Sequence, residues 1–192
     1  LHMQHDPSGF ERTMAVYNAL KDDGYQEVNN YWDGTPETGH RVFVMRKEID
    51  QLQDLIDGLK KDPYGRRHIV NSWNVGKVNK VALPACHAMF QCYVREGKDG
   101  RKYLDLKMYQ RSADSLLGIP FNIASYAMLT HLLAVLTDMQ PGILTITFGD
   151  LHIYQNHLAQ IWTQLSRDPL PLPELTVRHV NSLDEVTTGM FQ

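Results

Sequence analysis

Apolar residues recur at helical spacing in three parts of the chain. Over residues 47–61 the spacing predicts an amphipathic helix that ends at Asp62-Pro63. Its apolar face consists of Ile49, Leu52, Leu55, Ile56 and Leu59. Weaker patterns predict helices over residues 10–22 and 152–166. Residues 121–139 are apolar almost all round, which predicts a long buried helix at the centre of the fold.

Alternation of apolar and polar positions predicts the strands. Residues 89–95 and 103–110 flank the turn-forming segment EGKDGRK, which indicates an antiparallel hairpin. Residues 68–74, 143–148 and 175–180 are predicted as shorter strands. Residues 23–41 are rich in turn formers and are interpreted as a loop. Because no strand–helix–strand rhythm is visible, we expect one compact α+β domain, with a mainly antiparallel mixed sheet packed on the buried helix.

The composition is that of a globular protein, with 43% hydrophobic and 21% charged residues among 192. No window reaches the run of about 18 apolar residues that spans a bilayer, and the opening LHMQHDPSGF does not resemble a secretory signal. A cytoplasmic protein without a membrane partner is therefore expected. A net charge of −3 argues against a nucleic-acid partner and favours a small phosphorylated ligand at a local site.

The two cysteines, Cys86 and Cys92, match neither a disulfide framework nor a zinc site, and no metal is predicted. Motifs of serine hydrolases, P-loop enzymes and dinucleotide-binding folds are also absent. A lone cysteine is more often a buried hydrophobe than a nucleophile. A nucleophilic Cys86 would need a neighbouring cation, for which Arg111 and His87 are the candidates.

Several other polar residues have two interpretations each. Arg66-Arg67 follows a turn and is either a solvated surface pair or a bidentate phosphate ligand. Asn122 either caps the start of its helix or recognises a ligand through its amide. His152 and Tyr154 either pack in the core or bind a sugar hydroxyl. The segment containing Gln110, Arg111, Ser112 and Asp114 is, by itself, only a polar turn.

These features occur together in the blocks DPYGRRHIVNSWN, LPACHAMFQCYV, YLDLKMYQRSADSLLGIPFNIASYAML and GDLHIYQNHL. Over about residues 52–175 the sequence closely resembles the thymidylate synthases. The resemblance implies that Cys86 attacks carbon 6 of dUMP so that 5,10-methylenetetrahydrofolate can deliver one carbon to carbon 5. It implies that Arg111 binds the phosphate and stabilises the thiolate. His87 is kept as a further catalytic candidate because it adjoins Cys86 in the sequence.

The resemblance also implies the binding residues and a homodimer, in which Arg66 and Arg67 reach the partner's site. Asn122 would recognise the uracil edge, at a position where cytosine-specific relatives have aspartate. The expected dUMP ligands are Arg66, Arg67, Gln110, Arg111, Ser112, Asp114, Asn122, His152 and Tyr154. The expected folate-site residues are Asp114, Leu117, Gly118 and Phe121.

Some family features are not found in the sequence. Family members carry an RTGTGT-like loop and an HELLWFLxG-like helix ahead of the matching region, and a hydrophobic tail after it. Residues 1–46 are therefore interpreted as a divergent segment before a catalytic core at 47–192. Without these motifs, dUMP binding is expected to be retained and turnover to be slow. A dUMP hydroxymethylase and a catalytically weak nucleotide-binding homologue are the alternatives to a thymidylate synthase.

Overall fold

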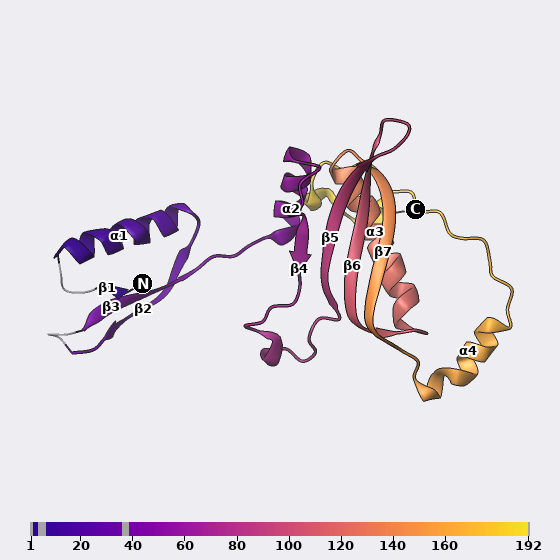
Figure 1. Cartoon of the computed structure of the whole chain (residues 1–192), viewed down its shortest axis with the longest axis horizontal. Coiled ribbons are helices and arrows are strands. Elements are labelled where there is room, and N and C mark those ends of the chain that lie inside the picture. The colour runs from indigo at the N-terminus through magenta and orange to yellow at the C-terminus, as the bar shows by residue number, and fades with distance from the viewer. Residues whose placement is uncertain (1, 4–6, 36–38, 192) are drawn as a thin grey trace. The chain divides into compact units, whose positions relative to one another are not determined.

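The computed structural model describes residues 2–3, 7–35 and 39–191, and in it the chain divides into two units (Figure 1). The first is Leu1–Asp50 and the second is Gln51–Gln192. Where one domain was expected, each unit thus has its own sheet. The division falls four residues after the predicted end of the divergent segment, immediately before the helix that the sequence predicts most clearly.

The first unit consists of helix α1 (Pro7–Asp22) and an antiparallel sheet. The strand order is β1 (His2–Met3), β3 (His40–Arg46), β2 (Gln26–Asp33). Tyr17 of α1 packs on Phe43 of β3 with ring centroids 4.9 Å apart. The predicted loop over residues 23–41 is therefore wrong. Most side chains of β2 are exposed, so the strand lacks the apolar alternation that would have indicated it.

The second unit is built on a four-stranded sheet with the order β4-β5-β6-β7. The strands are β4 (Ile69–Asn71), β5 (His87–Glu96), β6 (Lys102–Asp114) and β7 (Gln140–His152). The predicted hairpin is confirmed, since β5 and β6 pair antiparallel from His87↔Gln110 to Glu96↔Lys102. Leu104, Leu106 and Met108 alternate into the core and are at most 1% exposed.

Strands β6 and β7 are parallel, and helix α3 (Gly118–Leu136) connects them. The expectation that no strand–helix–strand unit occurs is therefore wrong. The predicted strand at 143–148 is the middle of a longer strand, and periodicity does not indicate which neighbour a strand pairs with. The mixed α+β class is confirmed.

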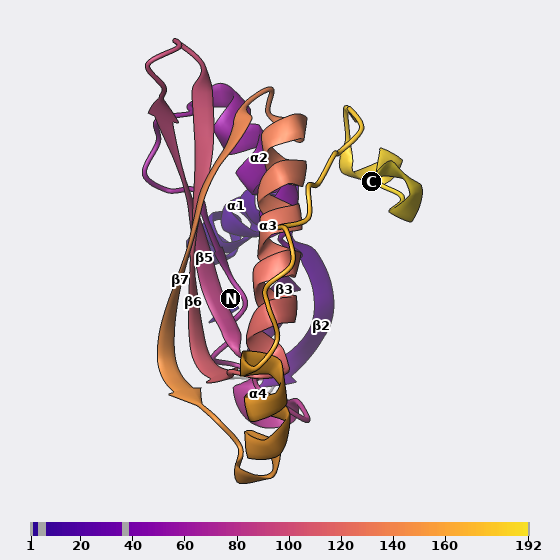
Figure 2. The same cartoon turned by 90° about the vertical axis from the view of Figure 1, so that its right-hand side faces the viewer.

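Helix α3 is buried over its second half only. Thr130, Leu133, Ala134 and Leu136 are buried, whereas Phe121 is 73% exposed. The prediction of a helix buried throughout is therefore not met in the isolated chain. Figure 2 shows α3 beside one face of the sheet. The sheet covers only the side of the helix that faces it. By length and composition α3 would also be able to cross a membrane. This corrects the expectation that no segment is suitable, although core helices of soluble proteins pass the same test.

Helix α2 (Gln51–Lys61) contributes Leu55, Ile56 and Leu59 to the core, as its apolar face predicts. Beyond β7 a 3-10 turn (Gln155–His157) leads into α4 (Leu158–Leu165), so the predicted helix begins later than residue 152. The predicted strand at 175–180 is represented by one bridge, Val177↔Phe191. Further short 3-10 turns lie between β4 and β5, at Val78–Lys80, and after α4, at Leu183–Glu185 and Thr188–Met190.

Candidate active site

Cys86 and Arg111 are brought together by the β5–β6 hairpin. Cys86 directly precedes β5, and the Arg111 backbone N–H donates to the Cys86 carbonyl at 2.9 Å. The Arg111 Nη2 lies 3.7 Å from the Cys86 Sγ. A cation at this distance stabilises negative charge on the sulfur.

The Arg111 guanidinium is held in place by neighbouring carbonyls. Its Nε donates to the Ala85 carbonyl at 3.0 Å and its Nη2 to the Pro84 carbonyl at 2.7 Å. The group also lies over the Trp73 ring, 5.7 Å from the centroid. Sequence reasoning did not identify Trp73 as part of this site, because the loop that carries it is brought here by tertiary structure alone. Arg111 is thus oriented before any ligand binds.

His87 occupies a different environment from Arg111. Its ring packs edge-on against Tyr126 of α3, with centroids 5.1 Å apart. Of the two candidate cations for a Cys86 thiolate, the geometry favours Arg111. Cys92 is only 1% exposed, and burial raises the pKa of its thiol to about 12. Cys86, which is partly buried, is therefore the cysteine that is suited to act as a nucleophile.

Gln110 connects strand β6 to the start of α3. It is 3% exposed, and its Nε2 donates to the Ser112 carbonyl at 3.1 Å and to the Asn122 Oδ1 at 2.9 Å. No side chain caps α3, so the geometry favours ligand recognition by Asn122 over helix capping. Because Gln110 supplies a donor to the Asn122 oxygen, the amide has a fixed orientation, with its Nδ2 available for an external acceptor.

The parallel pairing of β6 and β7 brings the His152 segment next to the end of β6 that carries Ser112 and Asp114. Asp114 is opposite His152, and the Ser115 N–H donates to the His152 carbonyl at 3.0 Å. The His152 Nδ1 lies 3.1 Å from the Asp150 Oδ1, and its ring is 4.9 Å from that of Tyr154. A sugar hydroxyl bound between His152 and Tyr154 would therefore lie beside the end of β6.

Asp114 organises the turn before α3. Its Oδ1 accepts hydrogen bonds from the backbone of Leu116 at 3.0 Å and Leu117 at 3.4 Å. The His157 Nδ1 lies 3.9 Å from the same oxygen and has no hydrogen-bond partner in the described part of the chain. The five-residue spacing between His152 and His157 argues against a metal pair, but it does not indicate that His157 lies close to Asp114.

Three of the four predicted folate-site residues lie at the start of α3. Leu117 and Phe121 are 55% and 73% exposed, and Gly118 lies between them in the first turn of the helix. They follow directly on Asp114 at the end of β6. An aromatic ring stacked here would lie on the side of the site bounded by Asn122 and Asp114.

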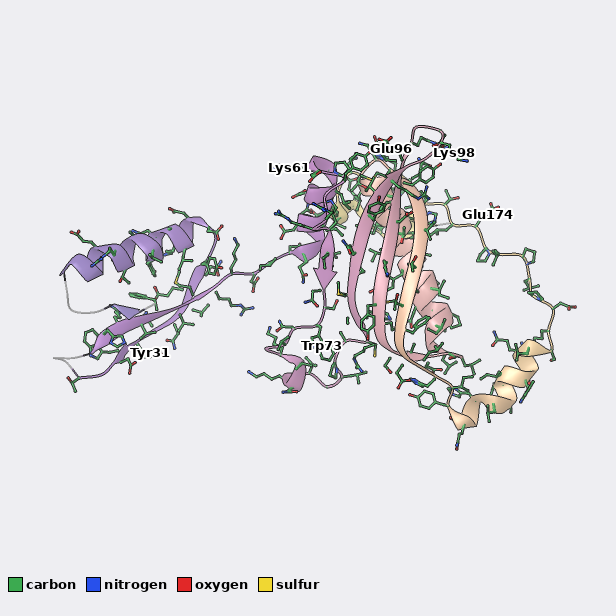
Figure 3. All side chains as sticks on the ribbon, in the orientation of Figure 1. Tyr31, Lys61, Trp73, Glu96, Lys98 and Glu174 are labelled. Atoms are coloured by element: carbon green, nitrogen blue, oxygen red, sulfur yellow. The ribbon has the colours of Figure 1, made fainter. Side chains whose placement is uncertain are left out.

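Arg66 and Arg67 are not part of this cluster. They precede β4, whose Ile69 is opposite Gln91 in β5. Because both arginines precede Ile69, they lie beyond Gln91, and at about 3.3 Å per residue the arginine turn is roughly 20–25 Å along the sheet from Cys86. Figure 3 shows Trp73 and Glu96 at opposite ends of the sheet. A cavity of about 750 Å³ lies at the arginine turn and is lined by both arginines.

Comparison with known proteins gives a consistent result. The sequence profile of the thymidylate synthase family matches residues 16–192, including most of the segment that was interpreted as divergent. A protein from Escherichia phage T5 named "Probable thymidylate synthase" is 56% identical over 128 residues, which are 67% of this chain and 44% of that protein. The chain thus spans less than half the length of this relative. The chain belongs to the thymidylate synthase family.

Proposed function

We propose that this chain transfers a one-carbon unit from 5,10-methylenetetrahydrofolate to carbon 5 of dUMP, giving dTMP and dihydrofolate. The observation that carries the proposal is the Arg111 guanidinium fixed 3.7 Å from the Cys86 sulfur. A structural cysteine does not need an oriented cation, whereas a covalent nucleophile does. Family membership supports the same conclusion.

In the proposed reaction, the Cys86 thiolate adds to carbon 6 of the uracil ring, and carbon 5 becomes nucleophilic. Carbon 5 attacks the methylene iminium of the folate and loses its proton. Elimination of tetrahydrofolate then leaves an exocyclic methylene. Hydride transfer from tetrahydrofolate completes the methyl group, and expulsion of Cys86 restores the ring. Arg111 stabilises the thiolate before attack and the substrate phosphate during it.

In this proposal, the other polar side chains of the site each bind a different part of the nucleotide. Asn122, oriented by Gln110, would recognise the uracil edge, and His152 with Tyr154 would bind the deoxyribose hydroxyl. Ser112 lies beside Arg111 in β6 and would share the phosphate. Leu117, Gly118 and Phe121 would contact the folate ring.

We also propose that the protein is a homodimer. The sheet face opposite α3 carries large apolar side chains that are 37–59% exposed in the single chain: Ile69, Met89, Tyr93, Tyr109 and Ile143. An uncovered apolar face of this kind marks an association surface. A partner on this face would complete the site with Arg66 and Arg67, which their own chain does not place near Cys86.

The proposal is tested by incubating the protein with dUMP and methylenetetrahydrofolate and identifying the nucleotide product by mass. Formation of dTMP is expected. Hydroxymethyl-dUMP would instead indicate that water replaces hydride in the last step, and binding without turnover would indicate a nucleotide-binding homologue.

A further inference from the structure

The turn that carries Arg66 and Arg67 has a firmly anchored backbone. The Gly65 N–H donates to the Asp62 carbonyl at 3.0 Å, and the Ile69 N–H donates to the Arg67 carbonyl at 2.8 Å. The Gln91 side chain reaches the Arg66 carbonyl from β5 at 3.4 Å. The path of the chain through both arginines is therefore fixed from both sides.

The two guanidinium groups differ from those of two arginines in the neighbouring β5–β6 hairpin, which form ion pairs. Arg95 is paired with Asp105 and Arg101 with Asp99. Arg66 and Arg67 are exposed, and within residues 2–3, 7–35 and 39–191 neither forms an ion pair. A fixed backbone with unpaired cations is the arrangement expected of residues kept available for an external anion.

The inner side of the turn rests on His68. This residue is 6% exposed, and its Nε2 lies 2.8 Å from the Asp62 carbonyl. A Cβ on Gly65 would lie 3.0 Å from the same nitrogen and 2.9 Å from the Asp62 Oδ2. A larger residue here would therefore have to displace the Asp62 side chain and shift the turn slightly away from the histidine.

The outer side of the turn is held by the end of the β5–β6 hairpin. The Tyr64 hydroxyl donates to the Glu96 Oε1 at 2.6 Å, and the Lys102 Nζ lies over the Tyr64 ring, 6.0 Å from its centroid. Glu96 and Lys102 are directly opposite each other, as the pair that flanks the turn of the hairpin. Figure 3 shows Glu96 on the same side of the unit as Lys61, which lines the cavity with both arginines.

We propose that Tyr64 and Glu96 are positioning residues, which tie the arginine turn to the hairpin and so present Arg66 and Arg67 to the nucleotide phosphate. This inference rests on the proposed function. The hydroxyl–carboxylate bond restrains Tyr64, which lies two residues before Arg66. Without it, the turn keeps its inner contact with His68 but loses its outer restraint, so the arginines sample more orientations before they bind phosphate.

The test is a double-mutant cycle of dUMP binding, measured by calorimetry on the full chain. Tyr64→Phe removes only the hydroxyl and should weaken dUMP binding about three- to tenfold, the range of one net hydrogen bond. The same change in an Arg66→Ala/Arg67→Ala background should have no further effect. Glu96→Ala should behave as Tyr64→Phe does, and Glu96→Gln, which keeps an acceptor oxygen, should restore most of the affinity.

Tyr103→Phe is the matched control. The Tyr103 hydroxyl donates to the Asp99 Oδ2 at 2.8 Å within the same hairpin, but this bond does not reach the arginine turn. Its removal should leave dUMP affinity unchanged.

An equal loss from Tyr64→Phe in both backgrounds would overturn the inference in favour of a general structural role. No loss in either background would overturn it as well. If the Arg66→Ala/Arg67→Ala protein binds dUMP normally, the arginine assignment fails and the inference fails with it. Absence of dUMP binding by the unmodified protein would instead refute the proposed function itself.

Discussion

The two cysteines of this protein lie in different environments. Cys92 lies in the core among Phe90, Val94 and Leu106, and burial raises the pKa of its thiol to about 12. Cys86 is partly buried and lies 3.7 Å from an oriented guanidinium. Residue identity and spacing alone could not separate these cases, because Arg111 is remote in sequence and reaches Cys86 only through strand pairing.

Cys86→Ser should abolish turnover, because a serine hydroxyl is ionised far less than a thiol beside a cation. The measurement is covalent adduct formation with 5-fluoro-dUMP and methylenetetrahydrofolate, followed by mass spectrometry of the intact protein. Cys92→Ala serves as the control and should retain the adduct. An adduct in the Cys86→Ser protein would refute the assignment of the nucleophile.

Asn122→Asp should weaken dUMP binding and strengthen dCMP binding. The carboxylate keeps an oxygen for the Gln110 donor, but it replaces the amide N–H₂ that would match the uracil oxygen with an acceptor suited to the cytosine amino group. Calorimetry with both nucleotides checks the result, and Asn122→Ala should weaken dUMP binding and reduce the preference for dUMP without creating one for dCMP. A preference that does not change in Asn122→Asp would show that this residue does not recognise the base.

Among the elements, those with strong periodicity were predicted correctly from the sequence. The α2 helix and the β5–β6 hairpin follow from the spacing of Leu55, Leu59, Leu104 and Leu106, whose side chains all enter one core. Strands β2 and β3 were missed because β2 is polar and mostly exposed. Its pairing depends on the neighbouring strand rather than on an apolar face.

The candidate site was predicted only in part. The residues were identified through the family resemblance, but the parallel pairing that brings His152 next to Asp114 was not. Neither was the position of Arg66 and Arg67 at the other end of the sheet. Both facts depend on topology, which the apolar pattern of single segments does not contain.

The half-buried α3 leads to a prediction about stability. Leu133 is 1% exposed and Met128 is 40% exposed on the same helix. Leu133→Ala should lower the free energy of unfolding by about 2–5 kcal/mol, as is usual for a core truncation. Met128→Ala should cost less than about 1 kcal/mol. Urea denaturation measures both. An equal cost would mean that the exposed side of α3 around Met128 is covered in the protein in solution.

For the whole molecule, the proposed shared site predicts complementation. A Cys86→Ser chain lacks the nucleophile, and an Arg66→Ala/Arg67→Ala chain lacks the phosphate ligands that it would give its partner. In a two-fold dimer, mixing the two inactive chains should restore one competent site per heterodimer. Steady-state turnover after unfolding and refolding the mixture is the measurement. No recovery would indicate that the arginines act within their own chain.

The parallel pairing of β6 with β7 also affects the order in which the site is assembled during folding. The β5–β6 hairpin closes a short loop, whereas the whole of α3 separates β6 from β7 along the chain. Local contacts form faster than contacts between distant segments. The Arg111 amide, bonded to Cys86, should therefore gain protection from hydrogen exchange before the Ser115 amide, bonded to His152. Pulse labelling during refolding would show a chain that has its nucleophile and cation in place before it has a site for the sugar.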